Sequence, residues 1–383
     1  MSARDFIYLC PFLVPLAGAL AVLMLDGVNR KKDDYWSLGV IAFVMSLGTG
    51  AWFLSYGWAV GSPVQVFSAL RLDGLAVFAG VMVSFCTAVV ALLCHEYLRR
   101  ENIPPGAFYS LLLIAAHGLI LLAACTDWIA FFVCLEIASV PLYILSGVEK
   151  RHHASREAAL KFFLLGAVAG ALVLYGIAFI FGATGTTAMR PDGPLSPQWA
   201  LSPHRRAPAL AGLCFRWAWR PCTSGRPIPS RVRPPRSSPS SLPPARWASS
   251  SRSCACSAAF CPAAAPVRRF FLVTLLYWIA LISMIFGNVM AVVQTQIKRI
   301  SSPTPAASRT AVTCVAATVV LAGRAATAPA PPSYIAAYCM MTLAAFPVLV
   351  ALGRQGDRDM AQYTGLFERQ PGLPSFTCSP CFP

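Results

Sequence analysis

The sequence predicts an all-α protein, a polytopic bundle of transmembrane helices, and three observations lead to this fold class. First, 57% of the 383 residues are hydrophobic and only 12% are charged, against about 25% charged in soluble domains. Second, the first half contains apolar runs of about 20 residues, the length that crosses a hydrocarbon core of about 30 Å. Third, the loops between these runs alternate between basic and nearly uncharged. This composition excludes a disordered protein and disfavours an ordinary soluble enzyme.

The apolar runs of residues 1–187 follow one another closely. They lie at about 6–25, 36–55, 74–94, 107–125, 128–147 and 158–182. The first run is too long and too interrupted by proline to be a cleaved signal peptide, and no small-residue cleavage site follows it. We therefore expect it to be the first of six transmembrane helices in residues 1–187.

The loop charges predict an orientation, because Lys and Arg are retained on the cytoplasmic side of a membrane. The basic residues of the first, third and fifth loops are Arg30, Lys31, Lys32, Arg99, Arg100, Lys150, Arg151 and Arg156. The second loop carries Arg71 alone, and the fourth carries neither Lys nor Arg. The alternation predicts a multi-pass membrane protein with its N-terminus outside.

Glu136 is the first candidate functional residue. It lies in FFVCLEIASVPLYILSG, about eight residues into the fifth run and so roughly 12 Å deep at 1.5 Å per residue. A carboxylate at this depth costs several kcal/mol unless it is paired or hydrated. It is either a protonated packing residue or a proton-relay carboxylate, and the second interpretation is favoured. Pro141 can open the helix backbone where a polar cavity would need room.

Lys161 is the second candidate, one turn into the sixth run, in REAALKFFLLGAVAGALVLYGIAFIFG. A lysine this close to a helix end can extend its ammonium to the membrane interface, so the residues alone leave both a structural and a relay role open. Gly166 and Gly170 form a GxxxG pair, which favours close helix contact. His117, in the fourth run, is interpreted as a packing partner.

Two blocks within residues 129–187, CLEIASVPLYILSG and EAALKFFLLGAVAGALVLYGIAFIFGATGTT, closely resemble subunit N of the bacterial proton-pumping NADH–quinone oxidoreductase, respiratory complex I. Residues 278–300 and 335–359 resemble the same family. The resemblance implies a helical bundle of the antiporter-like proton-channel type. It also implies a chain of charged groups along the membrane midplane, in which Glu136 is the fifth-helix glutamate and Lys161 the sixth-helix lysine, and it favours the relay role for Lys161.

The resemblance also implies what surrounds the chain. The complex would use NADH, quinone, flavin and iron–sulfur clusters in other subunits, with no cofactor and no metal on this chain. The partners would be other membrane-arm subunits and the lipid bilayer of the bacterial plasma membrane, and no nucleic acid. Two alternatives stay open: a cation/proton antiporter or hydrogenase membrane subunit of the same superfamily, and a non-transporting scaffold of the membrane arm.

The net charge of +16 is confined to the second half, because Lys and Arg balance Asp and Glu within residues 1–187. Residues 188–269 contain 15 Pro, 13 Ser and 13 Arg but no Lys. A disordered basic linker and a nucleic-acid-binding arm are two interpretations. Neither suits a place where the family has two helices and a loop. The third interpretation, a reading-frame error, is favoured.

The reading-frame hypothesis can be examined by shifting the frame by one base. The last base of each codon is then read together with the first two bases of the next codon. From Pro221 to Ala248, synonymous codons then permit VHIWAPDTFQGAPTPVVAFLSTAGKVG, which resembles the family's loop and eighth-helix start. The family's seventh-helix lysine would be the residue lost at Arg216. Residues 301–313 permit a similar continuation, and the tail resembles a further displacement where later family helices would begin. The hypothesis implies that the C-terminal part of the family's sequence is missing, and it leaves both a functional and a non-functional copy open.

The resulting division of the second half is a prediction in five segments. They are 188–269, out of frame and poorly ordered; 270–300, a transmembrane helix; 301–333, out of frame; 334–374, a transmembrane helix and loop; and 375–383, an aberrant tail. Cys378 and Cys381 form a C-x-x-C pair, but they lie in this displaced tail, so we expect no metal or redox site there.

Overall fold

The computed structural model describes residues 3–189, with gaps at 29–34, 60–63, 67–68, 102 and 149–152, and single helical residues at 278, 281, 285, 289 and 340. Residues 3–189 form helices α1 (Ala3–Val28), α2 (Tyr35–Ala59), α3 (Gly74–Glu101), α4 (Pro105–Ala124), α5 (Trp128–Ser146) and α6 (His153–Thr184), with strands β1 (Val64–Val66) and β2 (Leu70–Leu72). The predictions for the segments after residue 189 lie outside the described residues, apart from the five single positions.

The fold class predicted from the sequence, an all-α transmembrane bundle, is confirmed. Each of the six described helices is long and apolar enough to cross a membrane, and each predicted run falls within or almost within one of them. Several helices extend beyond the predicted runs. The 32 residues of α6 measure about 48 Å at 1.5 Å per residue, more than a hydrocarbon core of about 30 Å. The hydropathy pattern therefore identified the apolar part of α6, and it missed the polar residues at the start of this helix.

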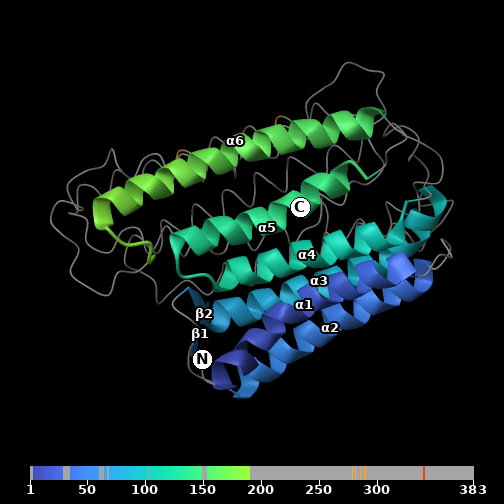
Figure 1. Cartoon of the computed structure of the whole chain (residues 1–383), viewed down its shortest axis with the longest axis horizontal. Coiled ribbons are helices and arrows are strands. Elements are labelled where there is room, and N and C mark those ends of the chain that lie inside the picture. Colours follow the sequence, from blue (N-terminus) through green and yellow to red (C-terminus); the bar gives the residue numbers. More distant parts are fainter. Residues whose placement is uncertain are drawn as a thin grey trace.

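Helix α4 is the centre of the described bundle, with α1, α2, α3 and α5 packed around it, while α6 packs on α5 at the edge (Figure 1). Buried residues make up 78% of the α4 span but only 33% of the α1 and α6 spans. A helix that is apolar on all sides is suited to such a central position. Pro105 begins α4 at a position where a proline costs no helical hydrogen bond.

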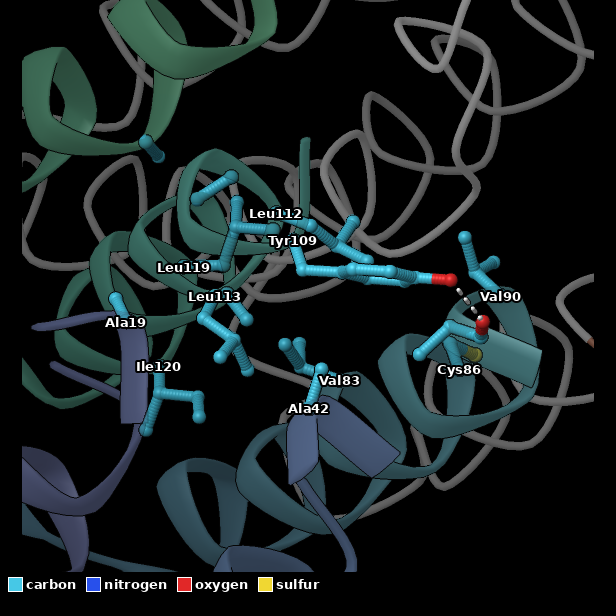
Figure 2. Close-up of a cluster of buried hydrophobic side chains, with 14 of the residues drawn as sticks. Ala19, Ala42, Val83, Cys86, Val90, Tyr109, Leu112, Leu113, Leu119 and Ile120 are labelled. Atoms are coloured by element: carbon cyan, nitrogen blue, oxygen red, sulfur yellow. Dashed lines mark hydrogen bonds between the residues drawn. The ribbon is translucent and has the colours of Figure 1, made fainter. Parts of the chain in front are cut away.

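Tyr109 joins three helices in the core of the bundle (Figure 2). Its side chain is fully buried, and its hydroxyl donates a hydrogen bond from α4 to the carbonyl of Ala91 in α3 at 3.3 Å. On the α2 side, a Cβ atom at Gly39 would come within 2.9 Å of the Tyr109 hydroxyl. Gly39 of α2 therefore leaves room for the Tyr109 hydroxyl. The hydroxyl of a buried tyrosine usually needs a hydrogen-bond partner.

Two glycines allow close contacts between α5 and its neighbours. A Cβ atom at Gly118 of α4 would lie 2.5 Å from the backbone nitrogen of Ala138 in α5, so the two backbones touch there. On the other side of α5, the ring of Tyr143 occupies the space where a Cβ of Gly166 in α6 would stand. Close contact at the GxxxG pair, predicted from the sequence, is thus found at Gly166.

One end of the bundle carries a small sheet that the sequence did not predict. Strands β1 and β2 form an antiparallel hairpin. Leu70 of β2 is bridged to Cys125, and Asp127 is bridged to Ala188. We call the four side-by-side segments, β1, β2, 125–127 and 187–189, the end sheet. It joins the α2–α3 loop, the α4–α5 turn and the chain after α6, which by the loop charges all belong to the side predicted to be outside.

Candidate functional site

Helix α5 places Glu136 about halfway along a transmembrane span. Asp127 caps the helix, its Oδ1 accepting hydrogen bonds from the amides of Ile129 at 2.7 Å and Ala130 at 3.4 Å. Such a cap satisfies backbone donors that a helix start leaves unpaired. Glu136 lies nine residues beyond the cap, or about 14 Å along the axis. The helix continues through Pro141 to Ser146, although Pro141 has no amide hydrogen to donate to the carbonyl of Ile137.

Glu136 as a whole residue is neither fully buried nor fully exposed. Its Oε2 accepts a hydrogen bond from the hydroxyl of Ser139 at 3.3 Å. Ala138 is buried against Gly118 of α4 and Ser139 is also buried, whereas an exposed apolar stripe runs along the adjoining side of α5. That stripe consists of Ile129, Val133, Val140 and Ile144. Glu136 therefore lies at the boundary between the packed face of α5 and its exposed stripe.

His117, one residue before the Gly118 contact with α5, faces α1 instead. It is 6% exposed, and its Nδ1 lies 2.6 Å from the carbonyl oxygen of Phe12. Because a carbonyl oxygen only accepts, Nδ1 is the nitrogen that carries the proton in this contact. The structure thus gives the predicted packing residue a specific partner, a backbone carbonyl between Pro11 and Pro15 of α1.

Lys161 lies on α6 and forms an ion pair with Glu157, one turn earlier on the same helix. Both side chains are partly exposed, 47% for Lys161 and 34% for Glu157. In the part of the chain that the structure describes, the Lys161 ammonium is therefore paired within α6 and not with Glu136.

The register between α5 and α6 separates the two predicted site residues. Gly147 of α5 faces Ala159 of α6, and Cys134 packs in one cluster with Val173. In this antiparallel register Glu136 is level with about residue 170 and Lys161 with about residue 146, so they differ by roughly 14 Å along the helix axes. Lys161 also lies five residues from Gly166, about 140° around α6 from the face that contacts α5.

Asp127 and Thr187 are not among the residues predicted from the sequence, and the fold brings them together from 60 residues apart. The Thr187 hydroxyl donates to Asp127 Oδ2 at 2.5 Å, while Oδ1 of the same carboxylate caps α5. An N-cap signal was present in the sequence, since Asp127 directly precedes an apolar run. No local pattern could have identified Thr187 as its partner.

The six apolar helices of the described residues, with α4 at their centre and a carboxylate inside α5, define a polytopic membrane protein. The family model described as "NADH:quinone oxidoreductase/Mrp antiporter, TM" matches residues 125–193 and 258–378. The matched region begins at the α4–α5 turn and includes both Glu136 and Lys161.

Comparison with related proteins shows which family within this class the chain belongs to. NADH-quinone oxidoreductase subunit N 1 of Solidesulfovibrio magneticus is 34% identical over 371 residues, covering 96% of this chain and 74% of the relative. Subunit N 1 of Chloroherpeton thalassium is 26% identical over 388 residues, covering 97% of this chain and 76% of the relative. The chain belongs to the NADH–quinone oxidoreductase subunit N family.

Solved structures agree with this assignment. A chain of respiratory complex I from Thermus thermophilus, solved with bound aureothin, superimposes with a TM-score of 0.70 at 25% identity, covering 95% of this chain and 75% of that one. A chain of an archaeal membrane-bound sulfane sulfur reductase superimposes with a TM-score of 0.73 at 19% identity, covering 97% and 76%. The second likeness concerns the fold alone. The protein is thus a multi-pass membrane subunit of the complex I type.

Proposed function

We propose that this chain, as a subunit N, couples electron transfer from NADH to quinone with proton translocation, and that Glu136 is the group that takes up and releases the proton. The observation that carries the proposal is the position of Glu136. The residue lies mid-span in α5 and is half-buried, and its carboxylate is hydrogen-bonded to Ser139. An ionisable group inside a membrane segment is costly and by default marks a proton or ion pathway.

In this mechanism a nearby cation sets the charge state of Glu136. A positive charge within about 4–6 Å favours the ionised carboxylate, and its withdrawal favours proton uptake. Because Lys161 and Glu136 are separated along the axes of α5 and α6, we infer that Lys161 is not this cation. The family's seventh-helix lysine, which corresponds to Arg216 in the frameshift hypothesis, is our candidate, although position 216 lies outside the described residues. Lys161, closer to the α5–α6 loop, would act as a relay or modulator.

The chain would work within a larger assembly. Its partners would be the other membrane-arm subunits in a bacterial plasma membrane, and NADH, flavin, iron–sulfur clusters and quinone would bind to other subunits. The N-terminus would face outside. An epitope tag at the N-terminus should then be accessible to antibody on spheroplasts, whereas the same tag in the α3–α4 loop should require permeabilised membranes. The reverse pattern would invert the orientation.

The proton role can be tested in inverted membrane vesicles that contain the complex assembled with this chain. NADH-driven acidification is followed by quenching of a pH-sensitive dye, with complex content measured in parallel. Glu136→Gln should remove most of the pumping at normal assembly, because glutamine keeps the shape but cannot carry the proton. Asp26→Asn is the matched control, since it makes the same acid-to-amide change near the end of α1, outside the proposed pathway, and it should leave most of the pumping.

Normal pumping by Glu136→Gln at normal assembly would contradict the proton role. If loss of the whole chain then also dissolved the complex, the scaffold function would be the better account. A transport activity independent of NADH would instead favour a cation/proton antiporter or hydrogenase subunit of the same superfamily.

A further inference from the structure

Asp127 contacts the start of α5 and the chain that follows α6 with a single carboxylate. Oδ1 caps α5 through the amides of Ile129 and Ala130. Oδ2 accepts the Thr187 hydroxyl at 2.5 Å from the chain that follows α6. Hydrogen bonds to an ionised carboxylate are among the stronger ones in proteins, so Asp127 joins the start of one span to the end of the next.

Backbone hydrogen bonds of the end sheet hold the same two segments together. The amide of Trp128 donates to the carbonyl of Thr187 at 2.8 Å, and the amide of Met189 donates to the carbonyl of Thr126 at 2.9 Å. Gly185, with φ of +71°, provides the left-handed turn that brings the chain from α6 into this pairing, a conformation that favours glycine. Asp127 thus lies within a defined junction.

An apolar cluster lies next to this junction and extends along α5 and α6 to about the level of Glu136. The buried side chain of Met189 packs in one cluster with Trp128, Cys134 and Val173. Val173 lies on α6 close to the level of Glu136. Tyr143, seven residues after Glu136 and on the same side of α5, contacts Gly166 of α6. The junction therefore sets the spacing and register of α5 and α6 where the carboxylate is placed.

We propose that Asp127 is a positioning residue for Glu136. By holding the start of α5 to residues 187–189, its carboxylate keeps α6 packed beside Glu136 and limits access to that side chain. This inference rests on the proposed function only for the role of Glu136 as a proton carrier. The effect of Asp127 on the packing of α6 beside Glu136 does not depend on pumping.

The test measures the access of a hydrophobic carbodiimide, which reacts with protonated carboxyl groups in membranes, to Glu136. The full chain in native membranes is treated with dicyclohexylcarbodiimide, and modification of the α5 peptide is followed over time by mass spectrometry. Glu136→Gln identifies the signal, since it removes the reactive group. Asp127→Ala should raise the initial rate about fivefold, the factor by which loss of a typical helix cap shifts a local opening equilibrium.

Three further variants separate positioning from general loosening of the fold. Thr187→Val keeps the α5 cap and removes only the link to α6, so it should also raise the rate. Asp127→Asn should restore a rate near that of the unsubstituted chain, because asparagine caps helices well and can still bond with a hydroxyl. Asp73→Ala is the matched control. Asp73 accepts the amide of Ala76 at 2.9 Å near the start of α3, so this variant removes an equivalent contact on another helix and should leave the rate unchanged.

Unchanged labelling in both Asp127→Ala and Thr187→Val would overturn the inference, as would an equal rise in Asp73→Ala. If Asp127→Ala accumulates poorly in membranes, Thr187→Val and the Asp127→Asn rescue decide the question. Normal pumping by Glu136→Gln together with altered labelling would remove the proton role and leave the positioning role standing.

Discussion

Lys161 forms its ion pair with Glu157 on its own helix, and this pair lies on the side of α6 turned away from the face that contacts α5. The register places Lys161 roughly 14 Å from the level of Glu136. The two residues that the family resemblance groups in one pathway are thus at different depths in the described structure. Their contributions to transport should differ in size.

We expect Lys161→Ala to lower NADH-driven pumping by less than Glu136→Gln does, because Lys161 is partly exposed and lies apart from the carboxylate. Its effect on folding should be small, since exposed ion pairs one turn apart contribute about 0.3–0.5 kcal/mol. Pumping in vesicles and the amount of chain in the membrane provide the two measurements. A loss as complete as that of Glu136→Gln would show that Lys161 is an obligatory part of the pathway.

Gly118→Val should destabilise the bundle by about 1–3 kcal/mol, the usual cost of overpacking a core. Even the Cβ atom would stand 2.5 Å from the backbone of Ala138, which cannot rotate away. Denaturation in mixed detergent micelles, followed by circular dichroism, measures the change. Gly48→Ala is the control, because a Cβ there meets nothing within 4 Å, and it should be neutral or slightly stabilising. Equal stability of the two variants would show that α4 and α5 are further apart than described.

His117→Phe should cost about 1 kcal/mol, within the range measured for hydrogen bonds between membrane helices. The substitution keeps an aromatic ring against α1 but removes the donor to the Phe12 carbonyl. His117→Asn restores a donor and should recover part of the loss, as measured by the same denaturation assay. A histidine that acted as an obligatory proton carrier would behave differently: both variants would abolish pumping while the bundle kept its stability.

The nucleotide sequence that encodes residues 185–335 should contain frame displacements near codon 216 and near codon 301. Restoring the frame is expected to place a lysine at the position of Arg216 and to convert the Pro-, Ser- and Arg-rich residues after it into the family's loop and the start of its eighth helix. Sequencing of the locus and of the messenger RNA checks this directly. A read that confirms the present frame throughout would refute the hypothesis and leave a basic linker as the interpretation.

Much of the fold could be predicted from the sequence because the bilayer imposes a one-dimensional requirement. About 20 apolar residues are needed for each crossing, so spans such as 128–147 can be recognised without knowing what they touch. Glu136 and Lys161 stood out for the same reason, as charges within apolar runs. The hairpin of β1 and β2 was missed because its strands contain three residues each, too few for a periodic pattern.

The amino-acid sequence by itself determined the class of protein, the six spans of the first half and the carboxylate inside the fifth, because hydropathy and charge act locally along the chain. Only the tertiary structure decided which groups meet. It joined Asp127 to Thr187, gave His117 the carbonyl of Phe12, and set Lys161 apart from Glu136. Those relationships depend on helix register and rotation, which follow from close packing at residues such as Gly118 and Gly166 and not from the polarity of the residues themselves.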